Sequence, residues 1–180
     1  MAMDYIGTFF TDEGFDFTGL LNADFFEPIR ILFRAEHYVS ATKLLVVAID
    51  SVAYVEFGDG ERNPFVAWLY RYANLGPIGV TPEELWEQRN SLLHMSNLDS
   101  RKVKKGEIRR LVAYVGGSPL DAPRSSDTMG YFNLQHLIVE FGHACGRWCD
   151  TYDKERAKID QFVERYDLIA SDARMMKVRV

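Results

Sequence analysis

The chain has 180 residues, a formal net charge of −5, and 47% apolar residues that include 13% aromatic ones. This composition suits one soluble globular domain with a sizeable core. The negative charge excludes indiscriminate coating of nucleic acid, which depends on neutralising phosphates, so nucleic-acid binding would need a local basic patch. The amino terminus carries acids and no basic region before an apolar run, so it does not resemble a secretory signal. Two cysteines give no disulfide framework and fit a reducing cytoplasm.

The chain begins with a segment that has no helical period. Residues 1–22 are aromatic and punctuated by glycine, which predicts an extended arm lying on the body of the protein. From residue 23 the pattern changes, and residues 24–36 predict a first helix. Pro28 is tolerable there only in or near the first turn, because proline lacks a backbone N–H.

A long apolar segment follows at His37–Phe57. It contains Lys43, Asp50 and Glu56, and charged side chains are rare and costly within the hydrocarbon of a membrane. We therefore expect the central helix of a bundle and no membrane association.

Two shorter helices are predicted next. The glycine-rich turn before Pro64 separates the long helix from a short one over residues 64–74. Thr81 is a good N-cap, Pro82 takes the first helical position, and Glu84 completes a capping box. This signal predicts a helix that runs to about Met95.

The stretch after this helix is polar and strongly basic. Between Arg101 and Arg110 it has six basic residues against one acid. A solvated loop explains such a charge run, and so does a patch that binds a phosphate-bearing substrate. The basic residues are Arg101, Lys102, Lys104, Lys105, Arg109 and Arg110.

A strand and a final long helix complete the prediction. Residues 111–115, within an insertion at about 107–116, are too short and too β-branched for a helix and predict a strand. The alternating residues 176–180 of this chain or a second one could pair with it. An apolar stripe then predicts a helix over 131–169, or two helices with a slight break.

No metal site or cofactor is predicted in the last helix. Cys145 and Cys149 lie in the apolar stripe, while His143 points roughly 160° away from Cys145 on an ideal helix. His136, Glu140 and His143 share the polar face, which we interpret as a solvated face. Two glycines four residues apart, Gly142 and Gly146, suit the close approach of another helix.

The helix that begins after Thr81 carries residues at odds with the face they occupy. Arg89 lies near the centre of its apolar stripe, Asn90 at the edge, and His94 close to the opposite side. An arginine in that position must be paired or lie at an interface, because a lone buried charge costs several kcal/mol, roughly. Glu56 and Asp50 are the candidate ion-pair partners, which would make Arg89 a structural core residue.

The six residues from Arg89 to His94 match the R-x4-6-H motif, with a polar residue directly after the arginine, of the HEPN superfamily (higher eukaryotes and prokaryotes nucleotide-binding). The chain resembles this family over residues 23–170, and residues 85–117 are similar to uncharacterised bacterial HEPN-like proteins. The resemblance implies an all-α, HEPN-like helical bundle of four to five helices with a short accessory strand or hairpin. An arm at 1–22 and a tail or strand at 171–180 flank this bundle.

The resemblance also implies a function. It predicts a cytoplasmic, metal-independent endoribonuclease that acts as a homodimer, leaves a 2',3'-cyclic phosphate, and works in defence or with an antitoxin or regulatory protein partner. His94 would transfer protons, Arg89 would stabilise charge on the phosphate, and Asn90 would orient the ring. On a straight helix Arg89 and His94 are about 140° apart, so one copy forms a joint site only if the helix end loosens, whereas two copies across a dyad share a cleft.

Two other classes of function remain open on the residues themselves. In the first, the chain is a non-catalytic HEPN-like interaction protein, and Arg89 is part of a core ion pair. In the second, it binds a nucleotide or another phosphate ligand without turnover. The position of His94 relative to Arg89 and to solvent discriminates between these alternatives and catalysis.

Overall fold

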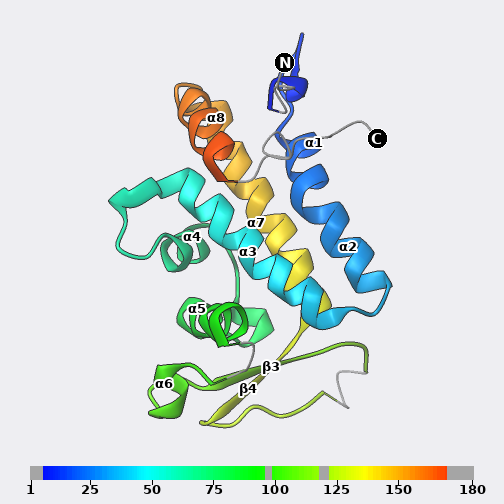
Figure 1. Ribbon diagram of the computed structural model, residues 1–180, viewed down its shortest axis with the longest axis vertical. Coiled ribbons are helices and arrows are strands. Elements are labelled where there is room, and N and C mark those ends of the chain that lie inside the picture. The colour runs from blue at the N-terminus through cyan, green and yellow to red at the C-terminus, as the bar shows by residue number, and fades with distance from the viewer. Residues whose placement is uncertain (1–5, 96–98, 118–121, 170–180) are drawn as a thin grey trace, which may run out of the picture.

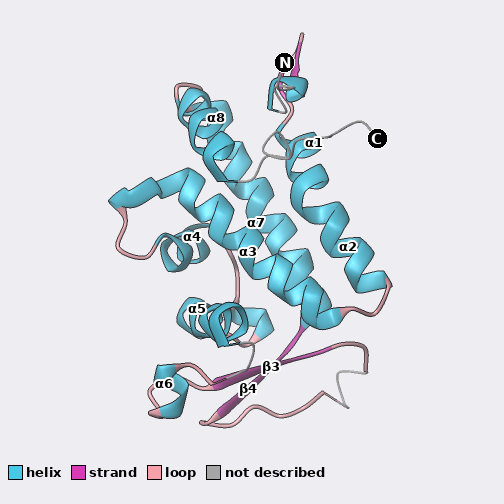
Figure 2. Cartoon of the chain, in the orientation of Figure 1, coloured by secondary structure: helices cyan, strands magenta, loops and turns pink. Residues whose placement is uncertain are grey.

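The computed structural model describes residues 6–95, 99–117 and 122–169. These residues are mostly helical and include two short pairs of strands, which confirms the helical bundle with a small β accessory. Figure 2 shows the helices gathered together, with the pair of strands β3 and β4 at one end.

The amino-terminal segment is folded rather than extended. A 3-10 turn at Ile6–Phe9 leads into a small antiparallel hairpin of β1 (Phe10–Thr11) and β2 (Gly14–Phe15). The ring of Phe15 lies 5.5 Å from that of Phe162 in the last helix. Aromatic packing therefore holds this segment against the carboxyl-terminal part of the bundle.

The first helical run begins earlier than predicted. It comprises α1 (Phe17–Leu21), a π-helical turn (Asn22–Phe26) and α2 (Glu27–Arg34) without interruption. Pro28 lies in the first turn of α2, as predicted, although α2 continues directly from the π-helical turn before it. The π-helical turn ends at Phe26, two residues before this proline, which has no backbone N–H to donate.

The long apolar segment forms α3 (Tyr38–Phe57), which crosses the middle of the molecule and packs against α2 and α8 (Figure 1). Its buried residues include Leu45, Ile49 and Val52. By length and composition alone, the stretch Tyr38–Gly60 is apolar enough to cross a membrane, but half of its most apolar window is buried inside the fold. This is weak evidence for a span, because a core helix has the same composition.

The next elements include the two predicted short helices, and a further short helix in the basic stretch for which no helix was predicted. They are α4 (Pro64–Tyr72), a 3-10 turn (Gly76–Ile78), α5 (Pro82–Asn90), a π-helical turn (Ser91–Met95) and the short α6 (Arg101–Lys104). The capping box of α5 is confirmed: the Thr81 hydroxyl accepts from the Glu84 amide at 3.2 Å, and Oε2 of Glu84 accepts from the Thr81 amide at 2.9 Å.

The predicted strand is β3 (Arg110–Tyr114), and it pairs in parallel with β4 (Met129–Asn133). The sequence pointed to residues 176–180 as the partner, and these lie outside the described residues. Leu111 and Phe132 are buried on the inner face of the pair. In Figure 1 α5 lies between this sheet and α3, and α5 contacts both.

The final helix is two helices, α7 (Leu134–Lys154) and α8 (Lys158–Ile169), as one of the two predicted alternatives had it. The expected start at residue 131 was wrong, because residues 131–133 belong to β4 and Asn133 caps α7 with its side chain. The apolar row of α7 is buried within the single chain, so it does not provide an exposed dimer surface. Its buried members are Leu137, Phe141, Cys145, Trp148 and Tyr152.

Of the two glycines on α7, only one lies at a helix contact. A Cβ at Gly142 would meet the Phe26 ring at 3.8 Å, whereas one at Gly146 would meet nothing within 4 Å. Close approach at Gly142 is therefore made within the chain, by the π-turn of the first helical run.

Candidate functional site

Arg89, Asn90 and His94 come together in one chain. Nη1 of Arg89 donates to Oδ1 of Asn90 at 3.1 Å and lies 3.1 Å from Nε2 of His94. Nη2 of Arg89 donates to Oδ2 of Asp50 on α3 at 2.5 Å. The guanidinium carbon also lies 5.0 Å from the centre of the Trp86 ring. The guanidinium therefore joins a carboxylate, an amide, an imidazole and an aromatic face.

A π-helical turn brings His94 to Arg89. The turn at Ser91–Met95 continues directly from α5. Hydrogen bonding from residue i to i+5 widens the turn, which reduces the angle between side chains five residues apart compared with an α-helix. At its start the Ser91 hydroxyl donates to the Glu87 carbonyl at 2.9 Å, a contact that competes with helical backbone bonds and bends helices. On a straight helix the side chains of Arg89 and His94 would point in different directions. The looser turn at the end of α5 brings them together instead.

The contact between Arg89 and His94 fixes the protonation of one ring nitrogen. A guanidinium only donates hydrogen bonds, so Nε2 of His94 must be the acceptor at 3.1 Å and carries no proton in this arrangement. His94 is exposed, whereas the side chain of Arg89 is 18% exposed. An accessible imidazole with an unprotonated Nε2 next to a fixed cation is suited to accept a proton beside an anion once the hydrogen bond from Arg89 is displaced.

The Arg89 side chain does not use all of its hydrogen-bond donors. In the described part of the chain its buried Nε has no hydrogen-bond partner, although both Nη atoms have partners. Trp86, one helical turn before Arg89, was not predicted as part of this cluster. Its i,i+3 spacing is the sequence signal that could have identified it.

Comparison with known proteins found no match to this chain among family models, curated proteins or solved structures.

Asp50 rather than Glu56 is the partner of Arg89. Glu56, only 4% exposed, accepts hydrogen bonds from Tyr72 Oη at 2.9 Å, Trp148 Nε1 at 3.0 Å and Lys158 Nζ at 3.2 Å. Burial by itself raises the pKa of Glu56, but these hydrogen bonds and the charge of Lys158 hold it below its ordinary value. Glu56 is therefore a structural residue that connects α3 to α4, α7 and α8.

The six basic residues after His94 divide into two groups. Four are ion-paired: Arg109 with Glu84 at 2.5 Å, Lys102 with Glu87 at 3.6 Å, Lys105 with Glu107 at 3.7 Å, and Arg110 with Asp99. The hydrogen bond to Glu84 raises the pKa of Arg109. Burial lowers this pKa, and the negative charge of Glu84 raises it further. Arg109 thereby connects the capping box of α5 to the start of β3. Arg101 and Lys104 are exposed on α6.

The cysteines and the polar face of α7 form no metal centre. Burial raises the pKa of Cys145 well above its usual range and that of Cys149 to about 12, so both thiols stay protonated. Within residues 6–95, 99–117 and 122–169, no three histidine, cysteine or acidic side chains are arranged to hold a metal ion.

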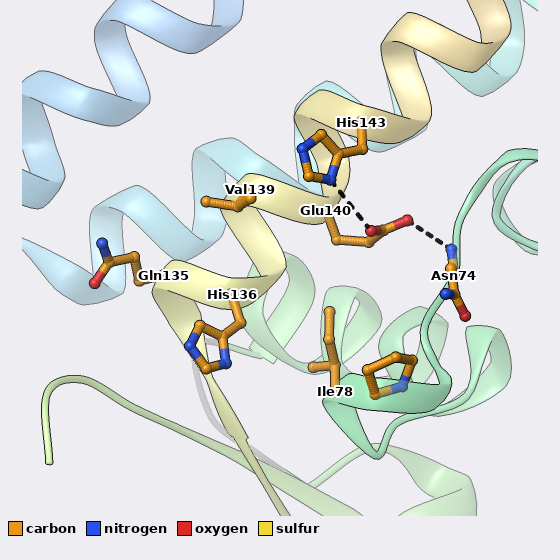
Figure 3. Close-up of a pocket in the computed structure, with 8 residues that line it drawn as sticks. Asn74, Ile78, Gln135, His136, Val139, Glu140 and His143 are labelled. Atoms are coloured by element: carbon orange, nitrogen blue, oxygen red, sulfur yellow. Dashed lines mark hydrogen bonds and ion pairs between the residues drawn. The ribbon is translucent and has the colours of Figure 1, made fainter. Parts of the chain in front are cut away.

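Two pockets lie apart from the Arg89 cluster. Figure 3 shows the first, about 360 Å³, between α7 and the turn at Gly76–Ile78, with His136 and His143 on its rim. Glu140 in its wall accepts from the Asn74 amide at 2.6 Å and pairs with Arg147. The second, about 270 Å³, is lined by α4 and the start of α5. Neither of these two pockets contains Arg89 or His94.

Proposed function

We propose that this chain is a metal-independent endoribonuclease of the HEPN type, cutting single-stranded RNA to leave a 2',3'-cyclic phosphate. The observation that carries the proposal is the 3.1 Å contact between Nη1 of Arg89 and Nε2 of His94. It joins the cation and the acid–base group of the R-x4-6-H motif in one chain. The His94 side chain is exposed, so a polymeric substrate can reach it.

The proposed reaction begins when a ribose 2'-hydroxyl takes the place of Arg89 Nη1 at Nε2 of His94. Nε2 accepts the hydroxyl proton, and the 2'-oxygen attacks the adjacent phosphorus as the bond from phosphorus to the 5'-oxygen breaks. Nη1, released from the ring, then donates to the phosphate oxygen on which charge develops. Replacement of Nη1 by the 2'-hydroxyl thus frees Nε2 of His94 to act as the base and frees the Arg89 guanidinium to bind the phosphate.

Two neighbours support this role for Arg89. Oδ2 of Asp50, 2.5 Å from Nη2, holds one arm of the guanidinium in place and leaves Nη1 directed at His94. Oδ1 of Asn90 accepts from the same Nη1 at 3.1 Å, which fixes its direction further. A preorganised donor costs little reorganisation when charge appears on the phosphate.

The leaving 5'-oxygen needs a proton as well. Once His94 has accepted the first proton it can donate it, or a second copy of the chain can supply its own protonated His94. We propose a homodimer in which two exposed His94 rings share one substrate, with a cytoplasmic antitoxin or regulatory protein as the natural partner. Since the apolar row of α7 is buried within the chain, this dimer would use another surface.

The ion pair with Asp50 favours a second candidate function. Arg89 is mostly buried and joined to a carboxylate on the central helix, as expected of a structural residue in a non-catalytic interaction protein or nucleotide-binding protein. In that case His94 is a surface histidine whose contact with Arg89 has no chemical consequence.

The test is RNA cleavage in EDTA by the wild type and the His94→Ala variant, with His143→Ala as a matched control. His143 is also an exposed histidine on a helix, 3.8 Å from Glu140, and its loss should leave activity unchanged. We expect cleavage of single-stranded RNA by the wild type and His143→Ala only, and none of DNA, which lacks the 2'-hydroxyl. Equal cleavage by His94→Ala would overturn the proposal, and no cleavage by the wild type across varied RNAs would favour the second candidate.

A further inference from the structure

The two-stranded sheet has an outer face that does not belong to the core. Leu111 and Phe132 are buried against the helices, and side chains alternate between the two faces of a strand. Val112, Tyr114 and Tyr131 therefore lie on the opposite face, where all three are partly exposed.

The register brings the two tyrosines close together. Val112 is opposite Tyr131, and Tyr114 is opposite Asn133, so Tyr114 and Tyr131 are diagonal neighbours on one face. Ideal sheet spacing puts their Cα atoms on the order of 8 Å apart. Two adjacent aromatic rings on a fixed β-scaffold are suited to stack two bases of an unpaired nucleic-acid strand.

The segment that contains this sheet is the positively charged part of an acidic protein. Residues 99–133 have seven Lys and Arg residues and four Asp and Glu residues, whereas the rest of the chain has fourteen and twenty-two. Arg101 and Lys104 on α6 are exposed, and Arg110, on the same face as the tyrosines, pairs with Asp99. Base-stacking rings with cations beside them match the chemistry of a single strand, which combines bases and phosphates.

The sheet is also connected to the Arg89 cluster. The Arg110–Asp99 ion pair joins the first residue of β3 to a residue five positions after His94. The inner face of the same sheet packs on α5, the helix that carries Arg89, and α6 lies beside the strands (Figure 1). The outer face is therefore linked, through Arg110, to the segment that follows His94.

We propose that the outer face of β3 and β4, with Tyr114 and Tyr131 as stacking residues and Arg101 and Lys104 as phosphate contacts, binds single-stranded RNA and guides it to Arg89 and His94. This inference rests on the proposed ribonuclease function. It assigns substrate binding to a surface outside the R-x4-6-H motif, with affinity that depends on aromatic faces and little on base sequence.

The experiment measures binding of a labelled, fully 2'-O-methylated, single-stranded oligoribonucleotide by fluorescence anisotropy. This probe lacks the nucleophilic hydroxyl, so binding is measured whether or not the protein cleaves RNA. Tyr131→Ala and Tyr114→Ala should each weaken binding by about 5- to 100-fold, whereas Tyr131→Phe, which keeps the ring, should bind like the wild type. Tyr70→Ala is the matched control, since Tyr70 is 65% exposed on α4, away from the sheet.

The outcomes separate the two proposals. Unchanged binding by Tyr131→Ala and Tyr114→Ala, with melting curves like that of the wild type, would overturn the stacking surface even if His94 proves essential for cleavage. Loss of binding by Tyr131→Phe as well as by the alanine variants would also overturn it, because stacking does not need the hydroxyl. Ring-dependent binding without any cleavage of natural RNA would support the surface and overturn the ribonuclease.

Discussion

Replacing Arg89 by alanine tests how much the Arg89–Asp50 ion pair contributes to stability and whether Arg89 is needed for RNA cleavage. Arg89 is 18% exposed and Asp50 35% exposed, so the pair is intermediate between two known limits. Breaking a fully buried pair costs about 3–5 kcal/mol because a charge is left in a dry interior, whereas an exposed pair contributes up to about 1 kcal/mol.

The expected cost follows from what the truncation leaves behind. Asp50 remains more than a third exposed and can be hydrated, which limits its penalty to about 1–2 kcal/mol. The contact of Arg89 with the Trp86 ring at 5.0 Å adds about 0.5–1 kcal/mol. We therefore expect Arg89→Ala to lower the free energy of unfolding by about 1.5–3 kcal/mol, and to abolish RNA cleavage.

The measurement is urea denaturation at pH 7, analysed at constant m-value. A double-mutant cycle with Asp50→Asn should give a coupling of about 1 kcal/mol. Arg62→Ala, at an exposed arginine, is the control and should change stability by less than about 0.5 kcal/mol. A loss above about 4 kcal/mol would refute this reasoning and identify a dry structural pair, while a loss below about 0.5 kcal/mol would show that the contact with Asp50 contributes nothing.

Two further predictions concern the acidic and basic residues around the site. Glu56→Gln should lower stability by about 2–4 kcal/mol at pH 7, because buried donors lose a carboxylate. The pKa of Glu56 is lower in the folded state than in the unfolded state, so its stabilisation is present above the unfolded pKa and is lost as pH falls through the folded pKa. In denaturation series at falling pH, the free energy of unfolding should therefore decrease less steeply for Glu56→Gln than for the wild type. Equal slopes would contradict the lowered pKa. Arg109→Ala should lower the free energy of unfolding by about 2–3 kcal/mol, because it leaves Glu84 unpaired. Lys104→Ala should change stability by less than about 0.5 kcal/mol. It should also lower the salt dependence of RNA binding by about one phosphate contact, measured by binding titrations at several salt concentrations.

Local signals were read correctly from the sequence because they act over a few residues. The Thr81 capping box is one hydrogen-bonded unit within four residues, and Asn63 similarly caps α4 by accepting from the Val66 amide at 3.2 Å. Such contacts depend little on the rest of the fold, so the sequence alone indicates where these helices begin.

Long-range pairing was harder to predict. On α3, Asp50 and Glu56 were both reasonable partners for Arg89, and the choice depends on how α5 crosses α3, which no local pattern specifies. The same limit applies to the strand partner. Residues 131–133 were predicted to begin the last helix, although they belong to β4, which is in register with β3. Pairing across the fold overrides local propensity in such segments.

The π-turn changes what the motif requires of a second chain. Counting at 100° per residue put Arg89 and His94 on different sides of a straight helix, so that either a loosened helix end or a dimer had to bring them together. The structure instead inserts a wider turn at Ser91–Met95 and joins the two side chains at 3.1 Å within one chain. In the proposed reaction, the second chain is then one of two sources of the proton for the leaving oxygen, the other being the same His94. The spacing of the two residues along the sequence specifies their geometry only together with the type of helical turn between them.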